Sequence, residues 1–547
     1  MDAATIQRRR WTILAVLSLS VFAIVVDNTI VNVALPTISR DLHATTSQLQ
    51  WIVDAYSLVF AGLLLAAGSL GDRFGRKGAL QFGMLAFATF SVAASLANSA
   101  GQLIAARAAM GIGAAFIFPA TLAILTNVFT EPSERAKAIG IWAGVTGLAV
   151  ALGPLSGGWI LEHFSWSAIF LVNVPIAIIT VGLGALVVPS SRDPRAPRVD
   201  LLGLVMSIVA VVSVVWATIE APDRGWTSPV ILGAYALGLA VVAVFITWER
   251  QSDHPMLDVN VFRNARFSAA SLSVAFAFFA LFGFVFLITQ YFQLVRGYDT
   301  LSAGVHTLPF AVVTGIVAPL STRLALRFGS KVIVVLGLAS MAAGFVVAST
   351  NGVDTPYWGG VIIGMILIAA GLGLTAAPAT ESIMGSLPPE RAGVGSAVND
   401  TTRELGGTLG VAVIGSVFSS VYGPRLVDAL RGVPLPSSAL SAARESVNAT
   451  FAVADQAGPQ GRAAVVGAAR SAFVDGYAAG SLVAAGVVMI GALIALLFLP
   501  ARARATGEQP LVTVGQPAGG ELGLDGSTEP GIDGLPELEP VFLAAGD

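Results

Sequence analysis

The sequence contains no cysteine, so it cannot form a disulfide or bind a metal through thiolates. Histidine is scarce as well, with four in 547 residues and none in the H-E-x-x-H pattern of zinc proteases. No G-x-x-x-x-G-K-[ST] phosphate loop is present, and the GIGAA stretch at 111–115 is too short for a dinucleotide-binding turn. We therefore expect no cofactor, no metal and no nucleotide partner.

Charge is the next scarce feature, at 12% of the residues with a formal net charge of −3. So small a net charge gives no reason to expect a nucleic-acid partner. Only three of the thirty cations are lysine, which together with abundant Ala, Gly and Val is typical of a GC-rich bacterial gene. The positions of the few charges are more informative than their sum.

Apolar residues, in contrast, make up 55% of the chain and occur in blocks of twenty or more. A bilayer core of about 30 Å requires about 20 helical residues, and the blocks show no period of two. We predict an all-α integral membrane protein in contact with the lipid bilayer. Its fourteen spans are expected near residues 12–34, 49–70, 79–98, 102–126, 138–160, 167–188, 201–219, 229–248, 267–292, 303–324, 332–350, 357–380, 396–420 and 476–499.

Cations in the connections orient these spans. If the N-terminus is cytoplasmic, the short cytoplasmic connections carry most of the Lys and Arg, and the short external ones carry Arg40, Arg224 and Arg296. Because cations concentrate in cytoplasmic loops, we expect both termini to be cytoplasmic. The segment 421–475 is then an external loop with some amphipathic helix, and 501–547, rich in acids, Gly and Pro, a disordered cytoplasmic tail.

Short motifs recur in the same order in the two parts of the chain, which indicates an internal duplication. The expected domains are a six-helix bundle over 1–190, an inserted helix pair over 191–255 and a second six-helix bundle over 256–500. Two like halves with a site between them are typical of transporters. The recurring pairs are RFGRK (73–77) with RFGSK (327–331), GIGAAFIFPAT (111–121) with GLGLTAAPAT (371–380), and PSERA (132–136) with PPERA (388–392).

The spans and motifs resemble the major facilitator superfamily in its fourteen-span drug:proton antiporter branch, the EmrB/QacA type, over nearly all of residues 10–500. The resemblance implies the major facilitator fold: two six-helix bundles in a pseudo-two-fold arrangement with two extra central helices. It also implies a multi-pass protein of the bacterial cytoplasmic membrane. Such a protein is a secondary active transporter rather than an enzyme, it uses protons as the coupling ion, and it serves multidrug efflux and antibiotic resistance.

Two charged residues lie deep within predicted spans. The stretch DNTIVNVALP (27–36) places Asp27 well inside the first span, and Arg107 lies at a similar depth in the fourth. A charge there costs several kcal/mol unless it is paired or faces water. By themselves, the residues are also compatible with a boundary acid and with an arginine that only binds helix carbonyls. The resemblance implies that Asp27 binds the proton or cation and that Arg107 takes part in proton transfer.

A second acid, Asp54, is expected one turn inside the outer end of the second span. Trp51 and Tyr56 fit an interfacial belt, so an acid that extends to water is equally compatible with this position. In the quaternary-ammonium branch of the family, an acid at the position of Asp54 is implicated in cation transport. We expect it to contribute to substrate binding.

The stretch SAVNDTTRELGGTLGVA (396–412) sets further charges in the thirteenth span. Asp400 and Glu404 are four residues apart and share a helix face, and the simple interpretation is an ion pair with Arg403. The resemblance makes Asn399 and Arg403 signature residues and both acids candidates for binding cationic substrates. Glu381 near the end of the twelfth span is expected to be a loop acid.

The decapeptide GSLGDRFGRK (68–77) connects the second and third spans. Arg73, Arg76 and Lys77 suit a cytoplasmic helix end, whereas Asp72 is disfavoured by the helix dipole there and should meet a cation or another helix N-terminus. The resemblance implies that Asp72, Arg73, Gly75 and Arg76 form a latch that holds one conformation. In the second half Leu326 stands in the place of Asp72.

Two more stretches match family motifs with one departure each. GVTGLAVALGPLSGGW (144–159) resembles the antiporter motif, although Ala149 stands where the pattern begins with Gly, and the Gly153-Pro154 step would permit gating by bending. A generic packing seam is the alternative. FSWSAIFLVNVP (164–175) resembles the turn into the sixth span, with Ser167 in the place of a common Arg.

The intramembrane acids outnumber the bases, which favours cationic substrates. The aromatic run at 274–292 offers rings that suit such cations, although runs of this kind also simply face lipid. The predicted function is proton-coupled export of small lipophilic, cationic or other amphiphilic compounds by alternating access. Export of a native lipid, siderophore or metabolite by the same mechanism is the alternative, and an intramembrane enzyme or scaffold is a more distant one.

Overall fold

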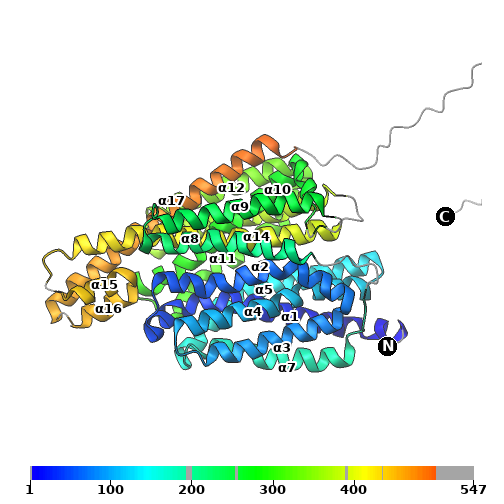
Figure 1. Cartoon of the computed structure of the whole chain (residues 1–547), viewed down its shortest axis with the longest axis horizontal. Helices are drawn as coiled ribbons and strands as arrows, with labels where there is room; N and C mark the ends of the chain where they lie inside the picture. The colour runs from blue at the N-terminus through cyan, green and yellow to red at the C-terminus, as the bar shows by residue number, and fades with distance from the viewer. Residues whose placement is uncertain are drawn as a thin grey trace, which may run out of the picture. The chain divides into compact units, whose positions relative to one another are not determined.

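A computed structural model describes residues 3–192, 200–252, 255, 257–387, 392–433, 435–456 and 458–500. Within these ranges the chain is helical and contains no strand. Fourteen of its helical stretches are long and apolar enough to cross a membrane, as predicted. The protein is therefore an all-α, multi-pass membrane protein (Figure 1). The predicted tail 501–547 lies outside the described residues.

The helices follow the chain in three groups. The first is α1 (Ala3–Leu42), α2 (Thr46–Phe74), α3 (Arg76–Ser95), α4 (Ala100–Val128), α5 (Pro132–His163), α6 (Ala168–Leu171) and α7 (Asn173–Val187). The second is the pair α8 (Leu201–Arg224) and α9 (Pro229–Gln251). The third is η1 (Val259–Arg263), α10 (Ala265–Gln290), η2 (Tyr291–Val295), α11 (Thr300–Phe328), α12 (Ser330–Ser349), η3 (Tyr357–Val361), α13 (Ile362–Met384), α14 (Ala392–Ala429), α15 (Ser437–Glu445), α16 (Val447–Gln456) and α17 (Gly458–Phe498).

Most of the segment 421–475 is helical, which differs from the expected loop. Helix α14 continues to Ala429, and α17 begins at Gly458 rather than near 476. The short helices α15 and α16 fill the interval between them. Alanine-rich stretches form helix readily but lack the hydropathy of a span, so the sequence placed the start of the last helix too late.

Local sequence explains where the helices begin and end. Thr45 and Gln48 form a capping box at the start of α2. The break between α2 and α3 falls at Gly75, whose φ of 126° is unfavourable for any residue with a Cβ. Gly329 makes the equivalent break between α11 and α12, with φ 91°. The two copies of the RFG motif thus form the same turn in the two halves.

Helix packing repeats between the first and the third group. In the first group α1 packs on α5, α2 and α3 on α4, and α3 on α7. In the third, α10 packs on α14, α11 and α12 on α13, and α12 on α17. Each pair has its counterpart in helices whose α numbers are nine or ten higher, as a duplicated chain requires. The domain boundaries proposed from the sequence stay a prediction.

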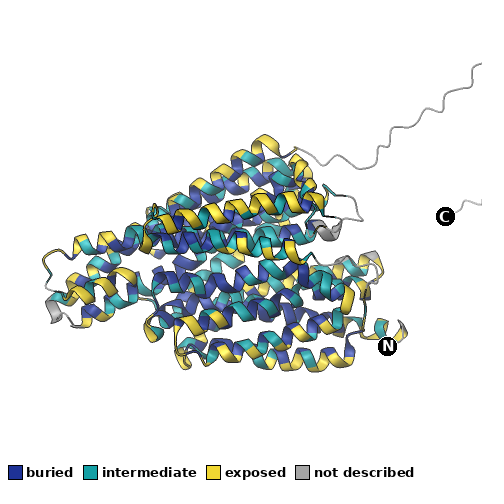
Figure 2. Ribbon diagram, viewed as in Figure 1, coloured by how far each residue is buried: buried dark blue, intermediate teal, exposed yellow. Residues whose placement is uncertain are grey.

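Helix α8 of the inserted pair lies across the seam between the two groups. It packs on both α2 and α14, and α9 packs on α8. The Ser416 hydroxyl on α14 donates to the Thr218 carbonyl on α8 at 2.7 Å, and Ser47 on α2 donates to Asp223 at 3.0 Å. Helix α9 is largely exposed (Figure 2), which suits a helix facing lipid.

The two groups meet at the end that carries the α1–α2 connection. There the Thr300 hydroxyl on α11 donates to the Gly158 carbonyl on α5 at 3.0 Å. Thr289 on α10 and Gln293 on η2 donate to backbone carbonyls of α1 at 2.9 and 2.8 Å. Toward the other end of α5, a Cβ on Gly144 would find no atom within 4 Å. The molecule is therefore closed at one end of the seam.

Candidate functional site

An ion pair between α1 and α4 occupies the interior of the first group. Asp27 and Arg107 are both fully buried, and Nη1 of Arg107 donates to Oδ2 of Asp27. Nε of Arg107 donates to the Ile52 carbonyl on α2 at 3.1 Å, and the guanidinium lies 4.3 Å from the centre of the Tyr56 ring. One guanidinium and one carboxylate thus connect three helices.

The second oxygen of Asp27 is held by a neutral residue. Nδ2 of Asn173, the first residue of α7, donates to Oδ1 of Asp27 at 2.8 Å and to the Ser91 hydroxyl on α3 at 2.9 Å. All three side chains are buried. Both carboxylate oxygens are therefore hydrogen-bonded, one to a charged and one to a neutral donor.

Asp54 on α2 is buried without a partner. Neither of its carboxylate oxygens has a hydrogen bond among the described residues, although its side chain is fully inaccessible. One turn earlier, Nε2 of Gln50 donates to the Val411 and Ala412 carbonyls of α14 at 3.1 and 2.9 Å. The acid therefore lies on the part of α2 that packs against α14.

The acids of α14 are not paired with Arg403 as the sequence suggested. Arg403 donates to the Thr380 hydroxyl at 3.0 Å, Thr380 donates to the side-chain oxygen Oδ1 of Asn399 at 3.0 Å, and Nδ2 of Asn399 donates to Asp400 at 3.2 Å. No direct ion pair joins Arg403 to an acid among the described residues. Arg403 extends toward α13 instead, where the Thr380 hydroxyl lies within hydrogen-bonding distance.

Glu404 completes the group of buried acids. Its Oε2 is buried and has no hydrogen-bond partner in the described part of the chain. Arg403 lies 5.2 Å from the ring centre of Phe278 on α10, so a cation already stacks on an aromatic ring here. The site on α14 therefore combines Glu404, an acid with a buried and unpartnered oxygen among the described residues, with the aromatic ring of Phe278 beside Arg403.

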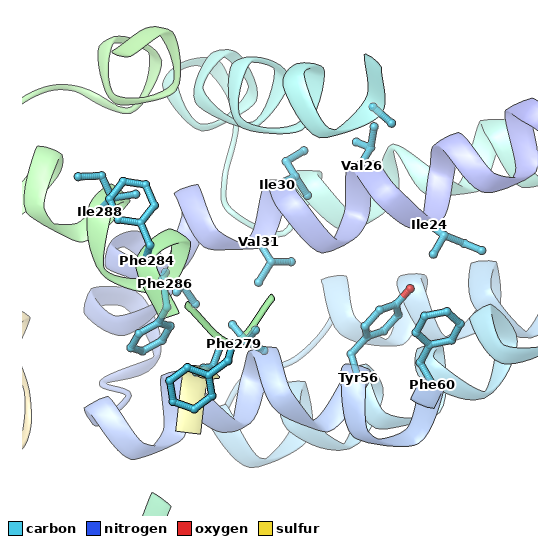
Figure 3. Packing of buried hydrophobic residues seen from close by; sticks show 14 of the residues in the cluster. Ile24, Val26, Ile30, Val31, Tyr56, Phe60, Phe279, Phe284, Phe286 and Ile288 are labelled. Atoms are coloured by element: carbon cyan, nitrogen blue, oxygen red, sulfur yellow. The ribbon is translucent and has the colours of Figure 1, made fainter. Parts of the chain in front are cut away.

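The aromatic run of α10 faces protein as well as the surroundings. Phe279, Phe284 and Phe286 are buried. In Figure 3 they approach Val31 of α1, and the Tyr56 hydroxyl points toward the same helix from α2. The interpretation of this run as mainly lipid-facing does not hold for these three residues.

The predicted gating residues lie at helix junctions. Nε of Arg76, the first residue of α3, donates to Asp72 in the last turn of α2 at 2.6 Å. Arg73 lies next to Asp72 in the last turn of α2, and Gly75 forms the break after it. Gly153 on α5 faces Thr29 of α1, and the Pro154 carbonyl faces Gly304 of α11. Their roles in gating stay predictions.

Sequence reasoning missed Asn173, Ser91 and Thr380. Each is a neutral residue in or next to an apolar segment, and only the fold shows which charged or polar side chain it contacts. A signal for Asn173 was present in the VNVP stretch, where an amide interrupts an apolar run.

Comparison with known proteins identifies the family that shares this architecture. The family model of the Major Facilitator Superfamily matches residues 17–411. The multidrug efflux pump LfrA of Mycolicibacterium smegmatis is 37% identical, covering 89% of this chain and 95% of LfrA. The methyl viologen resistance protein SmvA of Salmonella typhimurium is 33% identical over 91% of this chain and 99% of SmvA. The tetracenomycin C resistance and export protein of Streptomyces glaucescens is 32% identical over 90% and 92%.

Solved structures share the fold at low identity. A bacterial homologue of the human lysosomal transporter Spinster, in an inward-facing and occupied conformation, superposes with a TM-score of 0.62 at 17% identity, covering 89% of this chain and 96% of that one. The inward-open xylose transporter XylE from E. coli superposes with a TM-score of 0.53 at 14% identity, over 90% and 96%.

Fold and sequence together define a membrane transport protein. The chain belongs to the major facilitator superfamily. Its fourteen candidate spans fit the fourteen-helix drug:proton antiporter type, and its relatives are multidrug efflux and resistance proteins.

Proposed function

We propose that this protein exports lipophilic cations and other amphiphilic small molecules from the cytoplasm in exchange for protons. The relatives named above are efflux, resistance and export proteins, which supports the substrate class. The observation that carries the proton coupling is the buried pair of Asp27 and Arg107. A buried carboxylate whose cationic partner lies on another helix changes its proton affinity when that partner moves.

Coupling follows from the charge of this pair. Protonation of Asp27 removes its attraction to Arg107, so the contact that joins α1 to α4 and α2 weakens. Loss of the proton restores the attraction. A conformational change that alters the distance between these helices is therefore linked to proton binding, as alternating access requires. No cofactor enters this scheme, and the proton is the coupling ion.

The cation would be bound by the unpartnered acids of α2 and α14. Asp54 and Glu404 have buried carboxylate oxygens without hydrogen bonds among the described residues, which is unfavourable for a charged carboxylate that has no cation beside it. Phe278 already carries a cation on its ring. A lipophilic cation satisfies both features, because it neutralises the acids and stacks on aromatic rings.

The closed end of the seam is proposed to be extracellular. The cationic connections support this orientation, because Lys and Arg concentrate in cytoplasmic loops and both termini would then lie on the cytoplasmic side of the bacterial cytoplasmic membrane. Because the chain has no cysteine, a single introduced cysteine reports topology without background. A cysteine at the exposed Ser438 of α15 should react with a membrane-impermeant maleimide in intact cells, and protection there would reverse the orientation.

The test of coupling is Asp27→Asn in the purified full-length protein. In proteoliposomes with an imposed pH gradient, we expect this variant to lose gradient-driven ethidium transport. Asp41→Asn is the matched control, because Asp41 lies at the end of the same helix and, within the described part of the chain, pairs only with its neighbour Arg40. Full coupling in Asp27→Asn would refute the proposal, as would equal losses in the two variants.

A further inference from the structure

Asp27 has one oxygen, Oδ1, that contacts the neutral Asn173 rather than the charged Arg107, and this contact suggests a role for Asn173. Guanidinium groups only donate, so a proton on Oδ2 of Asp27 would point at the donors of Arg107. Oδ1, the oxygen that accepts from the neutral Asn173 at 2.8 Å, is therefore the more favourable site for the proton. In the charged state this contact needs a donor from residue 173, and in the neutral state it needs an acceptor.

A carboxamide is the side chain that supplies either one. Rotation by half a turn about its last bond exchanges the NH₂ group for the carbonyl oxygen at nearly the same positions. Ser91 fits the exchange as well. Its hydroxyl accepts from Nδ2 of Asn173 at 2.9 Å and donates to the sulfur of Met110 at 4.0 Å in this state. After the rotation, the hydroxyl can donate to the Asn173 carbonyl in place of this weak sulfur acceptor.

We infer that Asn173 is the positioning residue of Asp27, and that its amide rotates when Asp27 takes up a proton, with Ser91 changing from acceptor to donor. In the charged state Oδ1 accepts from Nδ2. When a proton from water binds Oδ1, the new O–H donates to the Asn173 carbonyl, which also accepts from Ser91. No covalent bond changes other than the one to the transferred proton, and the contact between Arg107 and Oδ2 weakens because the carboxyl group has become neutral. The inference rests on the proposed proton coupling.

The surroundings leave this role to Asn173. The titratable groups that interact with Asp27 from neighbouring helices are Arg107 on α4 and Tyr56 on α2. Arg107 cannot accept a hydrogen bond, and the Tyr56 hydroxyl has no hydrogen-bond partner among the described residues. Asn173 begins α7 directly after the short helix α6, so the start of a helix fixes its backbone.

The experiment measures the pH dependence of ethidium transport in proteoliposomes. Asn173→Leu keeps a similar size but offers neither donor nor acceptor. Asn173→Leu removes a hydrogen bond of about 1.5–3 kcal/mol from the charged state and one of about 0.5–1.5 kcal/mol from the protonated state, so the difference should move the pH midpoint upward by about 1 unit. We expect the maximal rate to fall while the KM for ethidium stays within about twofold.

Ser91→Ala should shift the midpoint in the same direction by less, and Ser91→Thr, which keeps the hydroxyl, should restore it. Thr180→Val is the control, because Thr180 lies on the same helix and its hydroxyl donates only to carbonyls of α7. If Asn173→Leu does not fold, the Ser91 pair still decides. A purely structural role would lower the rate equally at every pH, and unchanged midpoints in the Asn173 and Ser91 variants would overturn the inference.

The result is separable from the test of coupling. Loss of gradient-driven transport in Asp27→Asn with an unchanged midpoint in Asn173→Leu removes only the role of Asn173. Retained coupling in Asp27→Asn removes the proposed function itself.

Discussion

Replacement of Gly153 by alanine tests whether the contact between α1 and α5 is as tight as the structure shows. A Cβ at Gly153 would lie 2.8 Å from the Cβ of Thr29 and 3.3 Å from the Val26 carbonyl oxygen, and closer still to the Thr29 hydroxyl. That hydroxyl donates to the Val25 and Val26 carbonyls at 3.0 and 3.1 Å. Rotation of Thr29 would break these bonds and would leave its Cβ in place.

The magnitude follows from the required displacement. Carbon atoms pack best at about 3.5–4.0 Å, so the two helices must separate by about 1 Å. Overpacking of this kind costs about 1–3 kcal/mol. Gly147→Ala is the matched control, since it gains the same helix propensity on α5 and its Cβ would find no atom within 4 Å. The difference between the two variants therefore isolates the steric cost.

Thermal unfolding of the purified variants in one detergent measures this difference. An unfolding entropy of about 2.1 cal/mol/K per residue gives about 1 kcal/mol/K for a chain of this size. We expect Gly153→Ala to melt about 1–3 °C below Gly147→Ala. Thr29→Ala removes the nearest atom, so adding it to Gly153→Ala should recover part of the lost melting temperature. Equal melting temperatures would refute the close approach of the helices.

Three further predictions concern the junctions. Asp72→Asn should lower export while membrane insertion stays normal, because it weakens the bond to Arg76; unchanged labelling of single cysteines on both sides of the membrane would remove the latch role. Gln50→Leu removes the hydrogen bonds from α2 to α14 at the closed end of the seam, which should let that end open more often. A cysteine that replaces the buried Ser39 should then react faster with a maleimide, and an unchanged rate would show that these bonds do not hold the seam closed. The backbone N–H of Ser302 lowers the pKa of the N-cap residue Asp299, so its stabilising effect is full above the unfolded pKa and is lost as pH falls through the folded pKa. Asp299→Ala should thus cost about 1 kcal/mol at neutral pH and nothing in strong acid, and a pH-independent loss of melting temperature would contradict this.

The candidate site was predictable in part. Asp27 and Arg107 stood out because charges are rare within spans, and their depth suggested a shared position. The partners of Arg403 could not be foreseen, because spacing along one helix favoured Asp400 while the fold brought a hydroxyl from α13 nearer. Asn173 was missed since an amide in an apolar run becomes informative only when its neighbours are known.

The sequence by itself determined the class of the molecule. Runs of apolar residues must be helical in lipid because every backbone group needs an internal partner, so span number follows from composition and length alone. The repeated RFG turns depend on glycine at Gly75 and Gly329, which is also local. Only the tertiary structure decided which end of the seam is closed, that α8 crosses it, and which neutral side chains hold Asp27. Those outcomes depend on contacts between residues far apart in the chain, and the hydropathy of a sequence does not predict such contacts.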